Sequence, residues 1–542
     1  MVFGPLHSRV LSGRELLSDA DPFHLLLLTF MRLFPILSPP HLDAIALPQS
    51  PYHALKRRGL RRAKALKVTT NYSTLGGLLI MISDIAAIPE VERGIEAHGI
   101  ERVQPRARTH VRIFDNFTMW LSANLVLSTV VLGALATNVF ALGFWDSVVA
   151  IIIFNVLGAL PVAFFSTLGP KLGLRQMTIS RFSFGWIGAM VMVLFNVAAC
   201  IGWSAVNVIV GGQLVNALSG GVVPQQVGIL VITILTTIVS IYGYKYIHRY
   251  ERYAWIPMAV IFFILLGVAG PHLSIIPTPP LSIAEVASFV SFGGAVYGFA
   301  TGWSSYAADY NVKQPEETPA SRVFLLTFLG VVIPCIVLEI LGMALTTAYK
   351  GLGGGDLLAT GAKPLGSFGT FLLVLLALSV VSNNIPNDYS LGLSMQVLGK
   401  SFQRINRAVW ALIGAVIYVL IAVPAAANFN ETLSNFLLLI AYWLGPWSII
   451  LILEHFVFRR GRYNVDDWNT RSRLPIGWAA IISLVVGLVG VLLGAAQVYY
   501  VGPIARLFNP PFGMDIGFEL GLIFAGIAYF FLRNIELAQN GR

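Results

Sequence analysis

The sequence predicts an all-α polytopic membrane protein with about twelve transmembrane helices, and three observations support this fold class. Of 542 residues, 56% are hydrophobic and only 11% are charged, whereas a soluble protein carries about 25% charged residues. The apolar residues are grouped in repeated stretches of roughly 20, the length of a helix that spans a bilayer. The basic residues between these stretches alternate from loop to loop.

Each apolar stretch is bounded by a loop in which Gly and Pro are common, for example Gly351–Gly355 and Pro277–Pro280. We therefore expect twelve helices, over residues 117–141, 146–168, 184–214, 226–244, 253–270, 286–306, 322–348, 366–397, 407–426, 432–457, 475–499 and 514–533.

The loop charges test this arrangement independently. One set of alternate loops holds sixteen basic residues, and the other set holds three. The rich set contains Lys171, Arg175, Arg181, Lys245, Arg249, Arg252, Lys313, Arg322, Lys400, Arg404, Arg407, Arg459, Arg460, Arg462, Arg471 and Arg473; the poor set contains Lys350, Lys363 and Arg506. Cytoplasmic loops carry the excess of Lys and Arg, so both termini are predicted to be cytoplasmic.

Three regions follow from this topology. Residues 1–114 are expected to form a cytoplasmic, partly disordered extension, 115–535 the transporter domain, and 536–542 a cytoplasmic tail. The basic cluster at 56–67 is either a solvated face or a contact with anionic membrane lipid. Although the formal charge is +10, the basic residues form no single patch, so no nucleic-acid partner is expected. The oligomeric state is left open.

The sequence lacks the motifs of common enzyme classes. There is no phosphate-binding GxxxxGK[ST] loop and no HExxH, and the nine histidines lie without metal-ligand spacing. We therefore expect no catalytic residues, no metal and no cofactor.

Two helices in corresponding positions of the two halves carry residues that interrupt a regular helix. The first has Ser128 and Thr129 beside Asn124, and the sixth has Gly298, Gly302 and Trp303. Transporters bind substrate near the membrane midplane, where interrupted helices expose backbone groups. The glycines equally suit close helix packing, and the sequence leaves both interpretations open.

Amides lie in two further apolar helices. Trp203 and Asn207 are four residues apart in the helix over 184–214 and share one face. In the helix over 366–397, Pro386 removes a backbone donor beside Asn387. An indole stacks on a flat ring, and an amide matches an edge that presents C=O beside N–H. The predicted ligand is a planar, polar heterocycle.

Carboxylic acids in membrane helices are candidates for ion coupling. Asp388 is the strongest case, because a central carboxylate costs about 2.5–3.5 kcal/mol to insert and is relieved by holding a proton. A water-filled cavity or a basic partner would equally explain it. Glu339 is a second candidate. Glu454, beside His455 near a helix end, is expected to be interfacial.

Several segments resemble fungal purine–cytosine permeases of the nucleobase–cation symporter family. The resemblance runs from about Gly99 to the C-terminus. It is carried by Gly169–Met177, Ser180–Gly185, Phe114–Trp120, Tyr242–Tyr246, Tyr250–Tyr253, Asn384–Asn387 and Asp467–Asn469.

The resemblance implies a leucine-transporter-like inverted repeat of five plus five helices, with two further C-terminal helices. It also implies proton-coupled import of cytosine, adenine, guanine or hypoxanthine at the plasma membrane. Trp203 and Trp303 would flank the base, Asn207 and Asn387 would bind its edge, and Ser128 or Thr129 would complete the pocket, with Gly302 and Pro386 beside them.

Two departures from the family pattern bear on ion and substrate. The stretch Leu378–Ser382 lacks the adjacent Ser-Thr pair of sodium-coupled relatives, which favours protons over sodium. Asp388, directly after Pro386 and Asn387, favours a ligand with a basic nitrogen, so a vitamin B6 (pyridoxine) transporter on the same fold is the alternative. The alternative hypothesis from another functional class is a receptor that has the same fold but does not transport.

Overall fold

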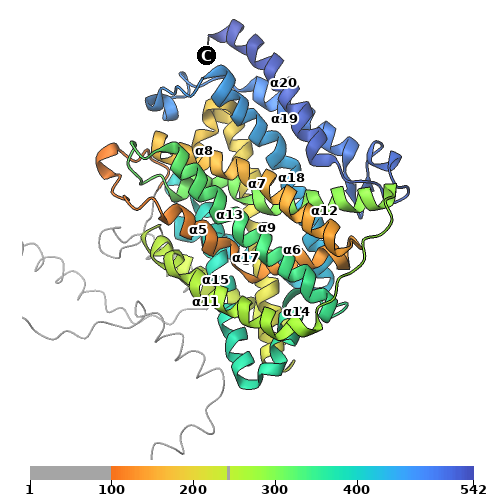
Figure 1. Cartoon of the computed structure of the whole chain (residues 1–542). Helices are drawn as coiled ribbons and strands as arrows, with labels where there is room; N and C mark the ends of the chain where they lie inside the picture. The colour runs from red at the N-terminus through yellow and green to blue at the C-terminus, as the bar shows by residue number, and fades with distance from the viewer. Residues whose placement is uncertain (1–98, 241–243, 542) are drawn as a thin grey trace, which may run out of the picture. The chain divides into compact units, whose positions relative to one another are not determined.

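The computed structural model of the chain describes residues 99–240 and 244–541. The predicted basic cluster and almost all of the N-terminal extension lie outside these residues. Within the described ranges, each of the twelve predicted segments coincides with a helix (Figure 1). Eight helical stretches of this part are long and apolar enough to cross a membrane, or nine if a bent pair is one span. One stretch, Arg407–Phe458, contains two predicted helices, and the shorter apolar helices α10 and α19 complete the set.

The long helices form two groups of five, followed by two more. The first group is α5 (Asp115–Asn124) with α6 (Leu127–Asn138), α7 (Phe144–Leu172), α9 (Arg181–Leu218), α10 (Gln225–Ser240) and α11 (Tyr244–Ala269). The second group is α12 (Ile283–Thr301) with the 3-10 helix η5 (Gly302–Tyr310), α13 (Ala320–Ala348), α15 (Gly366–Val397), α17 (Arg407–Ala425) and α18 (Phe429–Leu453). The last two are α19 (Trp478–Gly494) and α20 (Gly517–Asn540).

Short elements connect these helices. They are η3 (Pro105–Ala107), α8 (Gln176–Ile179), η4 (Gly270–His272), α14 (Gly354–Ala362), η6 (Lys363–Leu365), α16 (Lys400–Gln403), η7 (Ala426–Asn428), the π-turn η8 (Glu454–Phe458), η9 (Val465–Asn469), η10 (Ala505–Leu507) and a two-stranded antiparallel hairpin of β1 (Ala496–Gln497) and β2 (Tyr500–Val501).

The first long helix, one of the two candidates for an interrupted helix, is broken. α5 and α6 meet at an angle of 53°, and Leu125 and Val126 between them leave the helical conformation. A carbonyl exposed by the break is capped by a side chain: the Thr129 hydroxyl donates to the carbonyl of Asn124 at 2.6 Å. Asn124 Nδ2 donates to the carbonyl of Trp120, one turn earlier in α5, at 2.8 Å.

The sixth helix changes its winding at the corresponding position. The α-helical part α12 ends at Thr301, and η5 continues as a 3-10 helix in which Tyr306 has a φ of −143°. This confirms the expected interruption. Helices 1 and 6 therefore both change direction in mid-course, and each exposes polar groups there.

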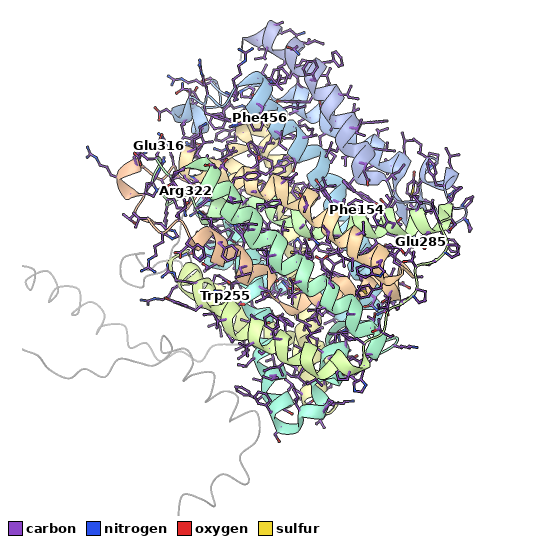
Figure 2. The ribbon with its side chains drawn as sticks, in the orientation of Figure 1. Phe154, Trp255, Glu285, Glu316, Arg322 and Phe456 are labelled. Carbon is purple, nitrogen blue, oxygen red and sulfur yellow. The ribbon has the colours of Figure 1, made fainter. Side chains whose placement is uncertain are left out.

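Glycine in α12 also serves close packing, so both interpretations of the sequence hold. A Cβ at Gly298 would overlap the carbonyl of Leu437 in α18, and one at Gly293 would overlap the ring of Phe154. Phe154 of α7 is labelled in Figure 2. It contacts Phe289 of α12 and Phe518 of α20, with ring centroids 6.2 and 6.5 Å apart. These contacts hold α7, α12 and α20 together.

A buried ion network joins α18 to the last two helices. Both oxygens of Glu454 accept from Arg533 of α20 at 3.0 Å, and Arg533 also pairs with Glu536 at 3.0 Å. Glu536 in turn accepts the backbone N–H of Gly477 at 2.8 Å, before α19. The interfacial position expected for Glu454 stays a prediction, since the structure contains no membrane. The residue is 1% exposed, and its charge is neutralised by Arg459 and by Arg533, 79 positions away.

The capped break gives a testable prediction. Thr129→Val keeps the size of the side chain but leaves the carbonyl of Asn124 without its hydroxyl donor, in a fully buried position. We expect the ligand-free protein to lose about 1–3 kcal/mol of stability, seen as a lower midpoint temperature of the purified protein in detergent. The control is Thr370→Val, whose hydroxyl also caps a carbonyl but is exposed. Equal midpoints for the two variants would contradict a capping role for Thr129.

Candidate functional site

A small buried cavity lies where the breaks in helices 1 and 6 face α9 and α15. Its volume is about 10 Å³, close to that of one water molecule. A planar heterocycle therefore enters only when the cavity walls separate. The lining side chains come from four chain segments and are Ser128, Trp203, Phe299, Gly302, Trp303, Tyr306, Asn383 and Asn387.

Two indoles form part of this wall, and each is held by edge-on aromatic contacts. Trp203 contacts Phe299 and Phe436, with centroids 5.4 and 5.1 Å apart. Trp303 contacts Trp120 and Tyr306 at 5.4 and 5.7 Å. The indole of Trp203 also lies against Gly302, where a Cβ would come within 2.8 Å of the ring. Glycine is therefore required beside the indole.

A chain of hydrogen bonds crosses the site from helix 1 to helix 6. The Ser128 hydroxyl donates to Asn207 Oδ1 at 3.2 Å, and Asn207 Nδ2 donates to Asn384 Oδ1 at 3.3 Å. Asn387 Nδ2 donates to the same Asn384 oxygen at 3.3 Å, and its own Oδ1 accepts from the Tyr306 hydroxyl at 2.9 Å. We call these five residues the amide relay. Four helices are thus joined by polar side chains inside the membrane-spanning region.

The structure brings most of the predicted residues together. Ser128, Trp203, Gly302, Trp303 and Asn387 line the cavity. Asn207 does not line the cavity but is bonded to Ser128, which does, and to Asn384 in the amide relay.

Two predicted residues have other contacts. Thr129 caps the helix 1 break, and the carbonyl of Pro386 accepts from the Tyr310 hydroxyl at 3.0 Å.

Three lining residues were not among the predicted site residues: Phe299, Tyr306 and Asn383. Tyr306 is three residues after Trp303, and a 3-10 helix places such residues on one face. Because the sequence did not reveal the 3-10 winding, this spacing was not a usable signal. Asn383 was visible as an amide in an apolar helix, and it also donates to the carbonyl of Ala123 at the helix 1 break.

Asp388 lies directly behind the wall. It is 1% exposed, and its Oδ1 accepts from the Ser204 hydroxyl at 3.4 Å. Ser204 follows Trp203 in the sequence, and Asp388 follows Asn387. This side-chain bond therefore connects α9 and α15 next to two residues of the cavity wall. Arg407 supplies an opposite charge nearby and donates to the carbonyl of Ser240 at 3.1 Å.

Glu339 lies outside the cavity wall. It is fully buried in α13, and its Oε2 accepts from Asn155 of α7 at 2.8 Å. Asn155 also donates to the carbonyl of Ile151 at 2.9 Å. Neither Glu339 nor Asp388 lines the cavity.

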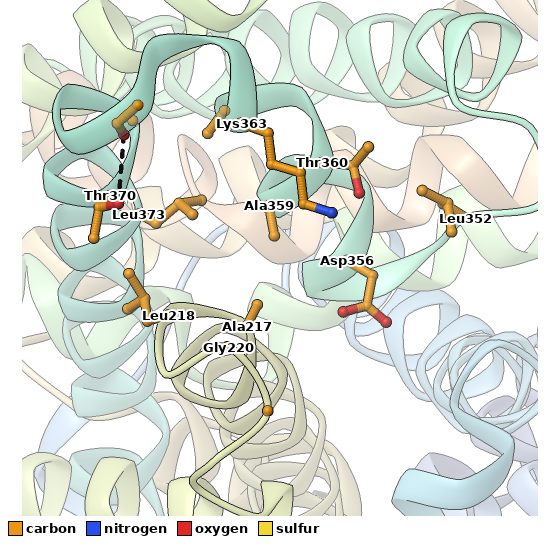
Figure 3. A pocket seen from close by; sticks show the side chains of 14 residues that line it. Ala217, Leu218, Gly220, Leu352, Asp356, Ala359, Thr360, Lys363, Thr370 and Leu373 are labelled. Atoms are coloured by element: carbon orange, nitrogen blue, oxygen red, sulfur yellow. Dashed lines mark hydrogen bonds between the residues drawn. The ribbon is translucent and has the colours of Figure 1, made fainter.

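A larger cavity of about 640 Å³ lies where α9 ends and α15 begins (Figure 3). Its polar lining includes Asp356 and Thr360 of α14 and Lys363 of η6. Asp356 and Lys363 are exposed, which distinguishes this hollow from the buried site. None of the predicted site residues lines it. Among the described residues, no group of three or more His, Cys, Asp or Glu side chains could hold a metal ion.

Comparisons with known proteins agree with these observations. A family model described as a permease for cytosine/purines, uracil, thiamine and allantoin matches residues 103–521. Purine-cytosine permease fcyB of Emericella nidulans is 44% identical over 466 residues, which cover 83% of this chain and 91% of that protein. Vitamin B6 transporter TPN1 of Saccharomyces cerevisiae is 31% identical over 514 residues, covering 83% of this chain and 89% of that protein.

A solved structure has the same fold. Mhp1, described as a nucleobase-cation-symport-1 family transporter in a closed conformation with bromovinylhydantoin bound, superposes with a TM-score of 0.64 at 16% identity. The match covers 84% of this chain and 97% of that chain. It confirms the predicted leucine-transporter-like fold of five plus five helices and two more. By sequence and by fold, this multi-pass membrane protein belongs to the family of permeases for cytosine and purines.

Proposed function

We propose that this chain is a proton-coupled symporter of the plasma membrane that imports cytosine and the purine nucleobases adenine, guanine and hypoxanthine. The observation that carries the proposal is the buried cavity, in which two indoles and the Asn387 amide face the same space. The 44% identity to a purine-cytosine permease supports this substrate class. The excess of Lys and Arg in alternate loops supports cytoplasmic termini, with residues 1–114 as a cytoplasmic extension.

The cavity residues have separate tasks in binding. Trp203 and Trp303 supply flat surfaces, and stacking one base on an aromatic ring contributes about 1–3 kcal/mol. Asn387 and Ser128 supply hydrogen-bonding groups to the edge of the base. Because the cavity is too small to hold a base, binding has to be coupled to movement of the helices that carry its lining residues. Such a movement is what alternating access requires.

Vitamin B6 is the second candidate substrate. TPN1 is named a vitamin B6 transporter and shares 31% identity with this chain. Asp388 gives the alternative a physical reason, because a carboxylate behind Asn387 would stabilise a ligand with a basic ring nitrogen. The higher identity to the purine-cytosine permease favours nucleobases.

Proton coupling is supported by the burial of two carboxylic acids. Asp388 and Glu339 are at most 1% exposed in membrane-spanning helices, where a bare charge is costly. Asp388 is the stronger candidate, because its bond to Ser204 links the two wall segments that hold Trp203 and Asn387. The hydroxyls of Ser379 and Ser382 donate to carbonyls of their own helix at 2.7 and 2.8 Å. This arrangement supports protons over sodium.

Uptake assays test the substrate and the driving ion together. Radiolabelled cytosine and adenine are offered to yeast cells that lack their own permeases and express this chain. We expect saturable uptake that is faster at acidic than at neutral pH and that collapses with a protonophore. Uptake that depends on sodium would contradict proton coupling. If surface-localised protein takes up pyridoxine but neither base, the substrate assignment is wrong.

The coupling residue is tested with neutral isosteres in proteoliposomes. Asp388→Asn should lose accumulation driven by a pH gradient and keep counterflow exchange within a few-fold of wild type, because the amide holds the Ser204 contact but no exchangeable proton. Glu339→Gln is the competing variant, and Asp356→Asn, at an exposed carboxylate, is the control. Loss of accumulation in Glu339→Gln alone would assign coupling to Glu339. Full accumulation in both buried variants would contradict both candidates.

A further inference from the structure

We propose that Tyr306 is a positioning residue that sets base selectivity. By donating to Asn387 Oδ1, its hydroxyl turns the amide N–H of Asn387 toward the ligand. The site then favours bases with an unprotonated ring nitrogen over bases, such as uracil, that have none. This inference rests on the proposed nucleobase function and assigns a role to a residue that does not itself have to bind the base.

The geometry begins with the change of winding in helix 6. Tyr306 lies in η5 with a φ of −143°, outside the helical range, and is 1% exposed. This turn brings its hydroxyl across to α15, 2.9 Å from Asn387 Oδ1. Since the oxygen of the Asn387 amide is occupied, the NH₂ group must point the other way. One N–H is donated to Asn384 Oδ1 at 3.3 Å, and the other is left for the cavity that Asn387 lines.

The opposite end of the amide relay fixes the same direction. Ser128 has a hydroxyl hydrogen to donate, and it occupies Asn207 Oδ1 at 3.2 Å. Asn207 must therefore also turn its NH₂ group toward Asn384 Oδ1. A flip of the Asn207 or Asn387 amide would bring two carbonyl oxygens together about where a 3.3 Å hydrogen bond now stands. In this structure two hydroxyls, from the broken helices 1 and 6, thus donate to the amide oxygens at both ends of the relay.

The resulting cavity presents hydrogen-bond donors. Asn387 offers an N–H, and Trp203 Nε1–H has no hydrogen-bond partner among the described residues. The indole N–H of Trp303, by contrast, is already donated to Asn124 Oδ1 at 2.9 Å. In the proposed arrangement the Asn387 N–H is donated to a ring nitrogen of the base, and that nitrogen must then carry no hydrogen.

The nucleobases differ in whether they have a ring nitrogen without a hydrogen. Cytosine, adenine, guanine and hypoxanthine each keep at least one ring nitrogen without a hydrogen. Both ring nitrogens of uracil carry one, so its only acceptors are the two carbonyl oxygens outside the ring. A ring N–H set against an amide N–H leaves two buried donors unpaired, and such mismatches are penalised strongly. Removing the Tyr306 hydroxyl frees Asn387 Oδ1 to accept a ring N–H, and the penalty on uracil falls.

The experiment measures selectivity rather than total activity. Uptake of radiolabelled cytosine is inhibited with unlabelled cytosine or uracil, in cells that express wild type or Tyr306→Phe. The ratio of the inhibition constants, uracil over cytosine, should fall by about tenfold in Tyr306→Phe, the effect of one hydrogen bond gained or lost.

Tyr310→Phe is the matched control. Tyr310 is also in η5 and is also buried, but its hydroxyl donates to the carbonyl of Pro386 and lies 3.3 Å from Ser390 Oγ, away from the cavity lining. This variant should keep the wild-type ratio within about twofold, even if its total uptake falls.

Each other outcome overturns the inference in a recognisable way. If Tyr306→Phe weakens both bases equally, or fails to reach the cell surface, the hydroxyl has a structural role and sets no selectivity. An unchanged ratio, with normal cytosine uptake by wild type, contradicts the role of Tyr306 and leaves the proposed function intact. A wild-type chain that takes up neither base contradicts the proposed function, and with it the inference.

Discussion

The structure depends on one constraint: inside a bilayer, every backbone N–H and C=O needs a partner within the protein. Helices 1 and 6 break where that constraint is most severe. The break in helix 1 is tolerated because Thr129 and Asn383 supply donors to the freed carbonyls of Asn124 and Ala123. Asn383 comes from α15, so the repair ties helix 1 to helix 8. Four residues later on the same helix, Asn387 faces the cavity. The site and the repair of the backbone are therefore built by neighbouring amides.

The positions of the helices could be predicted because the signal is local. A stretch of about 20 apolar residues specifies a span wherever its partners lie, and the alternating loop charges check the number of spans. Contacts between distant residues leave no such trace. Glu454 pairs with Arg459, which is close in the sequence, and with Arg533 in the last helix. Nothing in the sequence around Glu454 indicates the pairing with Arg533.

The composition of the site could be predicted further than its geometry. Trp203, Trp303 and Asn387 are conspicuous in apolar helices, and all three line the cavity. Ser128 and Thr129 could not be separated by sequence. They are adjacent, so they point in different directions around the helix, and one faces the cavity while the other faces the break. Tyr306 was missed because a tyrosine near an expected helix end is ordinary. Its importance comes from the 3-10 winding of η5, which the sequence did not reveal.

The small volume of the cavity has an energetic consequence for transport. In the closed state the two indoles are engaged with Phe299, Phe436, Trp120 and Tyr306, and an aromatic pair contributes about 0.5–1.5 kcal/mol beyond its buried area. An entering base replaces part of these contacts rather than filling empty space, so only the difference between the two sets appears as affinity. The aromatic contacts of the closed state therefore compete with the contacts that a bound base would make. That competition limits how tightly a base is held.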